Sequence, residues 1–124
     1  MLLTLDNNDA LYQIRAYTHD YFMINNERIT SSLIVSAQQL IAPWGPRCLA
    51  ELSAEHLLQV LPLEPEIILL GCGMHLQFPD AKLLAPLRAT GISVEIMSSG
   101  AACRTFAVLQ AEYRRVAAML LLHA

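Results

Sequence analysis

The strongest constraint on the fold is the uninterrupted run of large apolar residues Ile67–Leu70, which lies between Pro65 and Gly71. A strand with one face in water would alternate polar and apolar residues, so this run predicts a strand that is buried on both faces. Residues 92–97 form a second apolar strand, and the stretch 67–97 has the length of a strand–helix–strand unit, about 30 residues. The two strands should therefore be parallel, with a right-handed crossover.

Three helices are expected around these strands. Ser53 is a good N-cap for a helix that should stop at Pro62, and Asp80 can cap a second helix that Gly91 ends. After Ser98-Ser99-Gly100, apolar residues recur in steps of four and three, which is the period of a helix. They occupy positions 102, 106, 109, 113, 116 and 120. This spacing predicts one long C-terminal helix.

The first part of the chain is typical of antiparallel strands. Residues Tyr12–Tyr17 alternate in polarity, and Asn25-Asn26 between the apolar runs Tyr21–Ile24 and Arg28–Val35 is a hairpin signal, because Asn tolerates positive φ. Residues Leu40–Trp44 are expected to form one more strand. Together these elements predict a compact three-layer α/β domain. Its mixed sheet should combine N-terminal antiparallel hairpins with a C-terminal parallel βαβ unit and the long C-terminal helix.

The composition restricts the class of protein. Hydrophobic residues make up 55% of the 124 residues and charged residues 15%, against a usual charged share of roughly 25%, so the chain should fold. A net charge of −3 argues against nucleic acid as a partner. No apolar stretch reaches the ~20 residues of a spanning helix, and the start lacks the features of a signal peptide. We expect one cytoplasmic domain over residues 1–124.

A candidate site follows from the parallel strands, because ligands of such sheets bind beyond the carboxyl ends of the strands. Both expected ends are loops of small residues, and the second leads into a helix whose free N–H groups favour an anion. The candidate ligand- or anion-binding residues are Gly71, Gly73, Ser98, Ser99, Gly100, Arg104 and Thr105. The structural alternative is that the glycines allow a tight turn, the serines cap the helix and Arg104 pairs with a surface acid.

Metal and cysteine chemistry have weaker support. Cys72 and His75 have Cys-x-x-His spacing and Cys103 can come near, but a zinc site needs four ligands, or three and water. We therefore expect no metal and no cofactor. A helix N-terminus can lower the pKa of Cys103, yet no acid is placed to orient His75. All three cysteines, Cys48, Cys72 and Cys103, are expected to be buried thiols. No catalytic residue is assigned.

Several segments resemble the Mth nine-three-eight-like domain family. They are residues 63–73, which end in Gly-Cys-Gly, residues 91–109, which contain Ala-Ala-Cys-Arg-Thr, residues 32–36, and Pro43-Trp44. The resemblance covers nearly the whole chain and implies a three-layer α/β fold. The family's mitochondrial members are the third assembly factor of respiratory complex I, so it also implies an assembly role and no reaction. One departure is Phe106-Ala107, where members often carry Tyr-Asn, which removes an amide.

The sequence therefore leaves three functional hypotheses. The first is a non-enzymatic interaction protein that assists assembly of a respiratory, complex I-like membrane complex, with a protein partner and peripheral association with that complex. The second is a small-anion-binding protein or enzyme that uses the pocket between loops 71–73 and 98–105. The third is a homo-oligomer built on a self-complementary apolar face.

Overall fold

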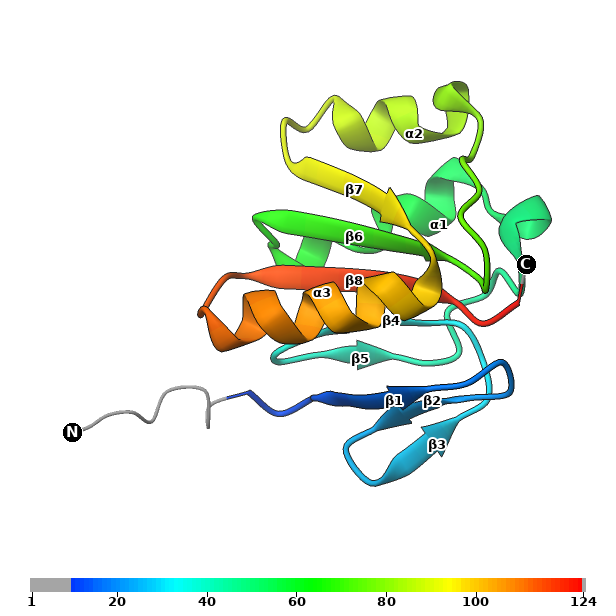
Figure 1. Ribbon diagram of the computed structural model, residues 1–124. Helices are drawn as coiled ribbons and strands as arrows, with labels where there is room; N and C mark the ends of the chain where they lie inside the picture. The colour runs from blue at the N-terminus through cyan, green and yellow to red at the C-terminus, as the bar shows by residue number, and fades with distance from the viewer. Residues whose placement is uncertain (1–9, 124) are drawn as a thin grey trace.

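The computed structural model describes residues 10–123, which form two sheets and three α-helices (Figure 1). The smaller sheet is antiparallel, has the order β1-β2-β3 and consists of Ile14–Tyr17, Phe22–Ile24 and Glu27–Ile29. The larger sheet has the order β5-β4-β8-β6-β7; in chain order its strands are β4 Leu33–Ser36, β5 Leu40–Ile41, β6 Ile67–Cys72, β7 Ser93–Met97 and β8 Val116–Leu121. The helices are α1 Ala54–Leu58, α2 Ala81–Arg88 and α3 Ser99–Ala111, with short 3-10 turns at Leu49–Glu51 and Leu61–Leu63.

The α/β class and the parallel βαβ unit are confirmed. Strands β6 and β7 run parallel in register from Ile67 opposite Ser93 to Gly71 opposite Met97. From Ile68 onward, every residue of β6 is buried. A polar side chain on either face would have no water to solvate it, which explains why the run is uniformly apolar.

The C-terminal helix is present, but its predicted continuation to position 120 is wrong. Helix α3 ends at Ala111, and the chain reverses at Tyr113, whose φ is +62°. Residues Val116–Leu121 then form β8, which lies between β4 and β6, antiparallel to the first and parallel to the second. All six residues of β8 are buried. The apolar positions 116 and 120 match the helical period only because the whole segment is apolar.

The hairpin at Asn25-Asn26 is confirmed, since Ile24 pairs with Glu27 and Asn25 has a φ of 54°. The expectation of one strand over Arg28–Val35 is wrong, because β3 and β4 belong to different sheets. Polar residues 30–32 separate them, and the Ser32 hydroxyl accepts a hydrogen bond from the N–H of Leu122 at 3.3 Å. The strand expected over 40–44 is shorter, because Pro43 has no N–H for a sheet hydrogen bond.

The capping predictions are confirmed at both short helices. Ser53 and His56 form a reciprocal capping box at α1, and the Asp80 side chain accepts from the N–H of Lys82 at α2. Helix α1 ends at Leu58, before the expected stop, and Pro62 lies in the following 3-10 turn.

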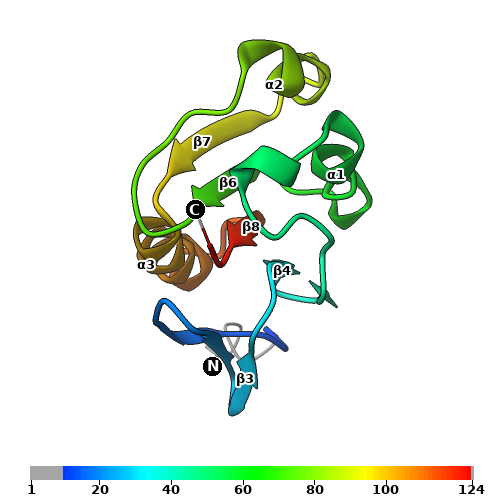
Figure 2. The ribbon, with the colours of Figure 1, turned by 90° about the vertical axis from the view of Figure 1, so that its right-hand side faces the viewer.

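The larger sheet is the middle of three layers (Figures 1 and 2). Helices α1 and α2 cover one face, and α3 and the smaller sheet cover the other. Alternate residues of β6 pack against opposite faces of the larger sheet. Ile68 and Leu70 pack with the side of α1 and α2, whereas Leu69 packs with Phe106 of α3. Each face therefore has its own apolar cluster, with the sheet as the shared wall.

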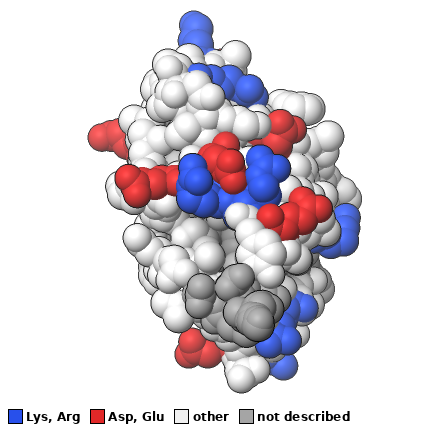
Figure 3. Space-filling view, turned by 90° about the vertical axis from the view of Figure 1, so that its left-hand side faces the viewer, with Lys and Arg blue, Asp and Glu red and all other residues white. Residues whose placement is uncertain are grey.

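Charged side chains connect two strands of the larger sheet at the end where β6 and β8 begin. The Glu66 carboxylate accepts from Arg114 Nε at 3.1 Å and from the backbone N–H of Arg115 at 2.9 Å. These contacts tie the start of β6 to the start of β8. Figure 3 faces this end and shows acidic and basic side chains intermixed, without a broad patch of one sign.

The strand assignment of 116–121 can be tested with Met119→Ala. Met119 is fully buried in β8, whereas in an extended helix it would lie off the apolar face. We expect the variant to lose about 2–5 kcal/mol in the free energy of unfolding, measured by urea denaturation. Val108→Ala on α3 is the control, since Val108 is 58% exposed and surface changes of this kind stay within ~0.5 kcal/mol. Equal effects of the two variants would contradict the burial of β8.

Candidate functional site

The loops that end β6 and β7 meet at one edge of the sheet, as the sequence predicts. The N–H of Ser99 donates to the carbonyl of Gly73 at 2.7 Å, and the N–H of Gly73 donates to the Ser99 hydroxyl at 2.9 Å. These two hydrogen bonds connect the loop after β6 directly to the first turn of α3.

The Ser99 hydroxyl is used inside the protein. Ser99 is fully buried, and its hydroxyl donates to the carbonyl of Leu121 at 2.6 Å while it accepts from Gly73. One side chain therefore joins α3, the end of β8 and the loop after β6. The structural alternative expected both serines to cap the helix, but the Ser99 hydroxyl does not cap α3 and has both its donor and its acceptor partner elsewhere in the protein.

Gly71 is required by a close approach of two backbones. A Cβ at this position would lie 2.8 Å from the Ser99 Cα, a distance that real Cβ atoms essentially do not show, and would make a tight contact of 3.0 Å with Leu120 Cδ2. Ser98 caps α3, because its hydroxyl accepts from the N–H of Ala101 at 3.2 Å. Gly71, Gly73 and Ser99 of the predicted site are thus in direct contact with one another across the two loops.

Three of the predicted site residues lie away from these contacts. Arg104 is exposed on α3, Gly100 is half-buried one turn before it, and Thr105 is half-buried beside it. Arg104 has no ion pair in the described part of the chain, so the expected pairing with a surface acid is not found. Gly100 and Arg104 instead line a separate pocket between α3 and β1. Anion binding by the predicted residues stays a prediction.

Cys72 and Cys103 are buried, as expected, but the expectation of burial is wrong for Cys48, which is half-buried. The two buried thiols do not have the properties of nucleophiles. Burial raises the pKa of Cys72 to about 11 and that of Cys103 to about 12. The pKa of Cys103 is therefore raised by desolvation, contrary to the lowering that its place near a helix N-terminus suggests. His75 is exposed. Among residues 10–123 no group of three His, Cys, Asp or Glu side chains is arranged to hold a metal.

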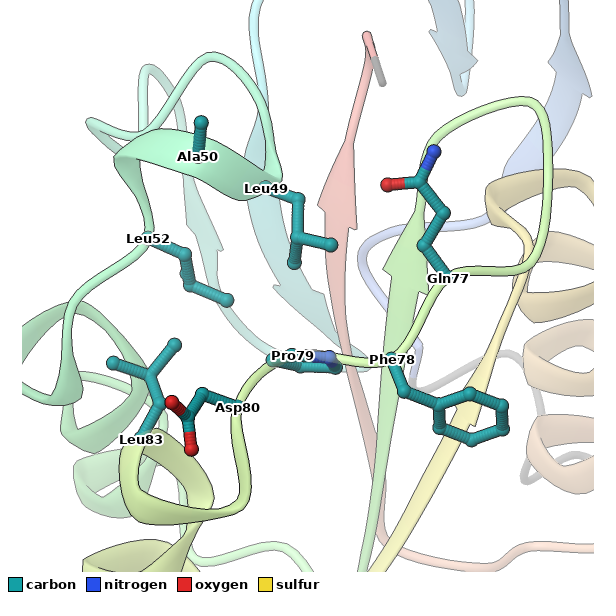
Figure 4. Close-up of a pocket in the computed structure, with 8 residues that line it drawn as sticks. All are labelled: Leu49, Ala50, Leu52, Gln77, Phe78, Pro79, Asp80 and Leu83. Carbon is teal, nitrogen blue, oxygen red and sulfur yellow. The ribbon is translucent and has the colours of Figure 1, made fainter.

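A second feature, which the sequence reasoning missed, is the loop between β6 and α2. It exposes Met74 by 56%, Leu76 by 55% and Phe78 by 69%. A groove of about 670 Å³ runs beside it. In Figure 4, Leu49, Leu52 and Leu83 point toward one another on one side of the loop, while Phe78 points away on the other. The sequence signal for this exposed loop is the placement of apolar residues at alternate positions between Gly73 and Pro79.

No helix within residues 10–123 has both the length and the apolar character needed to cross a membrane.

Comparison with known families decides the classification. A family model described as a protein of unknown function, DUF498/DUF598, matches residues 14–121. The chain belongs to this family. An NMR structure from Bordetella pertussis, described as an Mth938-like domain, has a TM-score of 0.80 and 28% identity and covers 98% of this chain and 92% of that one. The resemblance seen in the sequence is thereby confirmed.

Two further solved structures of this kind are similar. A crystal structure from Bordetella parapertussis has a TM-score of 0.83 and 34% identity, and covers 90% of this chain and 96% of that chain. An NMR structure from Xanthomonas campestris has a TM-score of 0.81 and 35% identity, and covers 98% and 92%.

The curated relatives carry two kinds of name. A 13 kDa major membrane protein of Francisella tularensis is 29% identical over 98% of this chain and 99% of that protein. The NADH dehydrogenase (ubiquinone) 1 alpha subcomplex assembly factor 3 of Danio rerio is 31% identical over 87% of this chain, and that of Xenopus tropicalis 28% over 87%. The matches span 63% and 60% of those two assembly factors, so this family member corresponds to less than two thirds of their length.

The Ser99 junction gives a test that compares neighbouring serines. Ser99→Ala leaves the N–H of Gly73 and the carbonyl of Leu121 buried without this partner, which should lower the free energy of unfolding by about 2 kcal/mol or more. Ser98→Ala removes only a helix cap and should cost ~1 kcal/mol. Chemical denaturation of both variants provides the comparison. A smaller loss for Ser99→Ala than for Ser98→Ala would contradict the structural role.

Thiol reactivity tests the burial of the cysteines. At pH 8 we expect iodoacetamide to alkylate the half-buried Cys48, whereas Cys72 and Cys103 react only after the protein is unfolded in urea. Because the folded state raises the last two pKa values, the free energy of unfolding should fall as the pH rises above the ordinary thiol pKa of about 9. Mass spectrometry of peptides locates the label. Rapid labelling of native Cys103 at pH 8 would refute this account.

Proposed function

We propose that this chain acts as a binding protein that assists the assembly of a respiratory, complex I-like membrane complex. The observation that carries the proposal is the extent of the match to the assembly factors, which includes 87% of this chain. The similarity therefore spans the described α/β domain and is not limited to one element. A role that depends on the whole domain fits binding to another protein.

The exposed loop after β6 supplies a surface for such a partner. Met74, Leu76 and Phe78 lie within one short segment and are each more than half exposed. Single exposed apolar residues are ordinary, but a group of large ones beside a groove is typical of a protein-binding surface. We propose that this surface, residues 74–78 with the adjoining groove, contacts an apolar segment of a subunit of the complex.

The small-ligand alternative between loops 71–73 and 98–105 has less support. Ser99 and the two glycines are engaged with one another, and the high pKa values of Cys72 and Cys103 do not favour a thiolate nucleophile.

The test combines deletion and substitution in the organism that encodes the chain. Deletion of the gene should reduce the amount of assembled NADH dehydrogenase on native gels, and the unaltered gene should restore it. A variant with Met74→Ser, Leu76→Ser and Phe78→Ser should restore less than half of that amount. Cross-linking of the tagged wild-type protein should recover subunits of the complex, and the variant should recover fewer.

A matched control separates this surface from general loss of apolar area. Leu11, Val108 and Tyr113 are 58–60% exposed elsewhere on the molecule, and a variant with serine at these three positions should restore assembly fully. Circular dichroism and thermal melting verify that both variants are folded. Normal assembly in the deletion strain would overturn the proposed function, and normal rescue by the 74/76/78 variant would overturn the proposed surface.

A further inference from the structure

A small pocket lies between β1 and the first turns of α3. It has a volume of about 240 Å³, which corresponds to the liquid volume of about eight water molecules. Ligand pockets of drug size are usually larger, roughly 300–1,000 Å³. The residues relevant to its chemistry are Ile14, Arg15, Tyr17, Gly100, Arg104 and Ala107. The pocket is therefore suited to a ligand of only a few non-hydrogen atoms.

Two arginines from different elements border this pocket. Arg15 comes from β1 and Arg104 from α3, and both are exposed. Within residues 10–123 neither of them forms an ion pair, whereas Arg47 and Arg114 each have a glutamate partner. Two positive charges that share one hollow repel each other, and a bound anion would relieve this repulsion.

The ring of Tyr17 contributes to the same pocket, whereas its hydroxyl group is buried. The Tyr17 ring atoms Cδ2 and Cε2 lie nearest to Gly100, and the hydroxyl oxygen exposes less than 1 Å². Burial also raises the pKa of Tyr17, so the group keeps its proton and adds no negative charge beside the arginines. The charge that lines the pocket therefore comes from Arg15 and Arg104.

Gly100 lies beside both Arg104 and the ring of Tyr17. A Cβ on Gly100 would be 3.5 Å from Arg104 Nη1 and 3.5 Å from Tyr17 Cδ2. The guanidinium group and the phenol ring therefore both border the space above this glycine.

We infer that this pocket binds a small oxyanion, a carboxylate or a phosphate, through ion pairs with Arg15 and Arg104. The planar guanidinium group presents paired donors that match the oxygens of both kinds of anion. The inference goes beyond the proposed function, since the pocket shares no residue with the 74–78 surface or its groove.

The first test measures binding of two probes, sodium phosphate and sodium acetate, by isothermal titration and thermal melting at constant ionic strength. At least one probe should raise the melting temperature above that in matched sodium chloride, because a ligand of the native state stabilises it. Arg15→Gln and Arg104→Gln should each weaken binding about tenfold. The probe that binds more tightly identifies the anion class. No rise with either probe, or undiminished binding by the Arg104→Gln variant, would overturn the inference.

Tyr17→Phe examines the hydroxyl group separately. The variant should be as stable as the wild type or more stable without anion, because it removes a buried group that lacks a partner. It should bind the effective probe as tightly as the wild type, because the hydroxyl oxygen exposes less than 1 Å² and does not face the pocket. A large loss of affinity in this folded variant would overturn the assignment of the anion to the two arginines alone.

A second pair of variants places the negative charge on the protein itself. Ala107→Glu adds a carboxylate at an exposed residue that lines the pocket, while Val108→Glu adds one at the neighbouring exposed residue outside it. Ala107→Glu should abolish the response to the effective probe, and Val108→Glu should keep it. Equal responses of the two folded variants would place the binding elsewhere and overturn the inference.

Discussion

The structure depends on the hydrogen bonds of one buried hydroxyl group, that of Ser99. It donates to the end of β8, accepts from the loop after β6 and belongs to the first turn of α3. The approach is close because Gly71 has no side chain. The junction therefore fixes where α3 starts and how it lies on the sheet.

The two faces of α3 differ in their surroundings. Ala102 and Phe106 are fully buried in the apolar cluster that α3 shares with the larger sheet. Arg104 and Ala107 face outward, toward β1 and its sheet. The smaller sheet thus completes a pocket whose other wall is held by the Ser99 junction. The exposed apolar loop leaves from the same end of β6 on a path toward α2, so protein binding and anion binding would use separate surfaces.

The sequence predicted what depends on local chemistry and missed what depends on distant partners. The buried run at 67–70, the N-caps Ser53 and Asp80 and the turn at Asn25 were all readable from neighbouring residues. Strand β8 was not, because an entirely apolar segment fits a helical period and a strand equally well. The loops after β6 and β7 meet at a common edge, as the sequence predicts, but Ser99 finds its hydrogen-bond partners 22 and 26 residues away. No pattern along the chain reveals that its hydroxyl is already engaged.

The position of β8 governs the order in which the domain can be completed during synthesis. Its neighbours β4 and β6 are separated in the sheet until residues 116–121 are inserted between them. A nascent chain on the ribosome that stops short of this segment holds two half-sheets, each with an unpaired hydrogen-bonding edge. Such edges attract other strands, so a chain in which β8 has not yet been inserted is exposed to aggregation at both half-sheets.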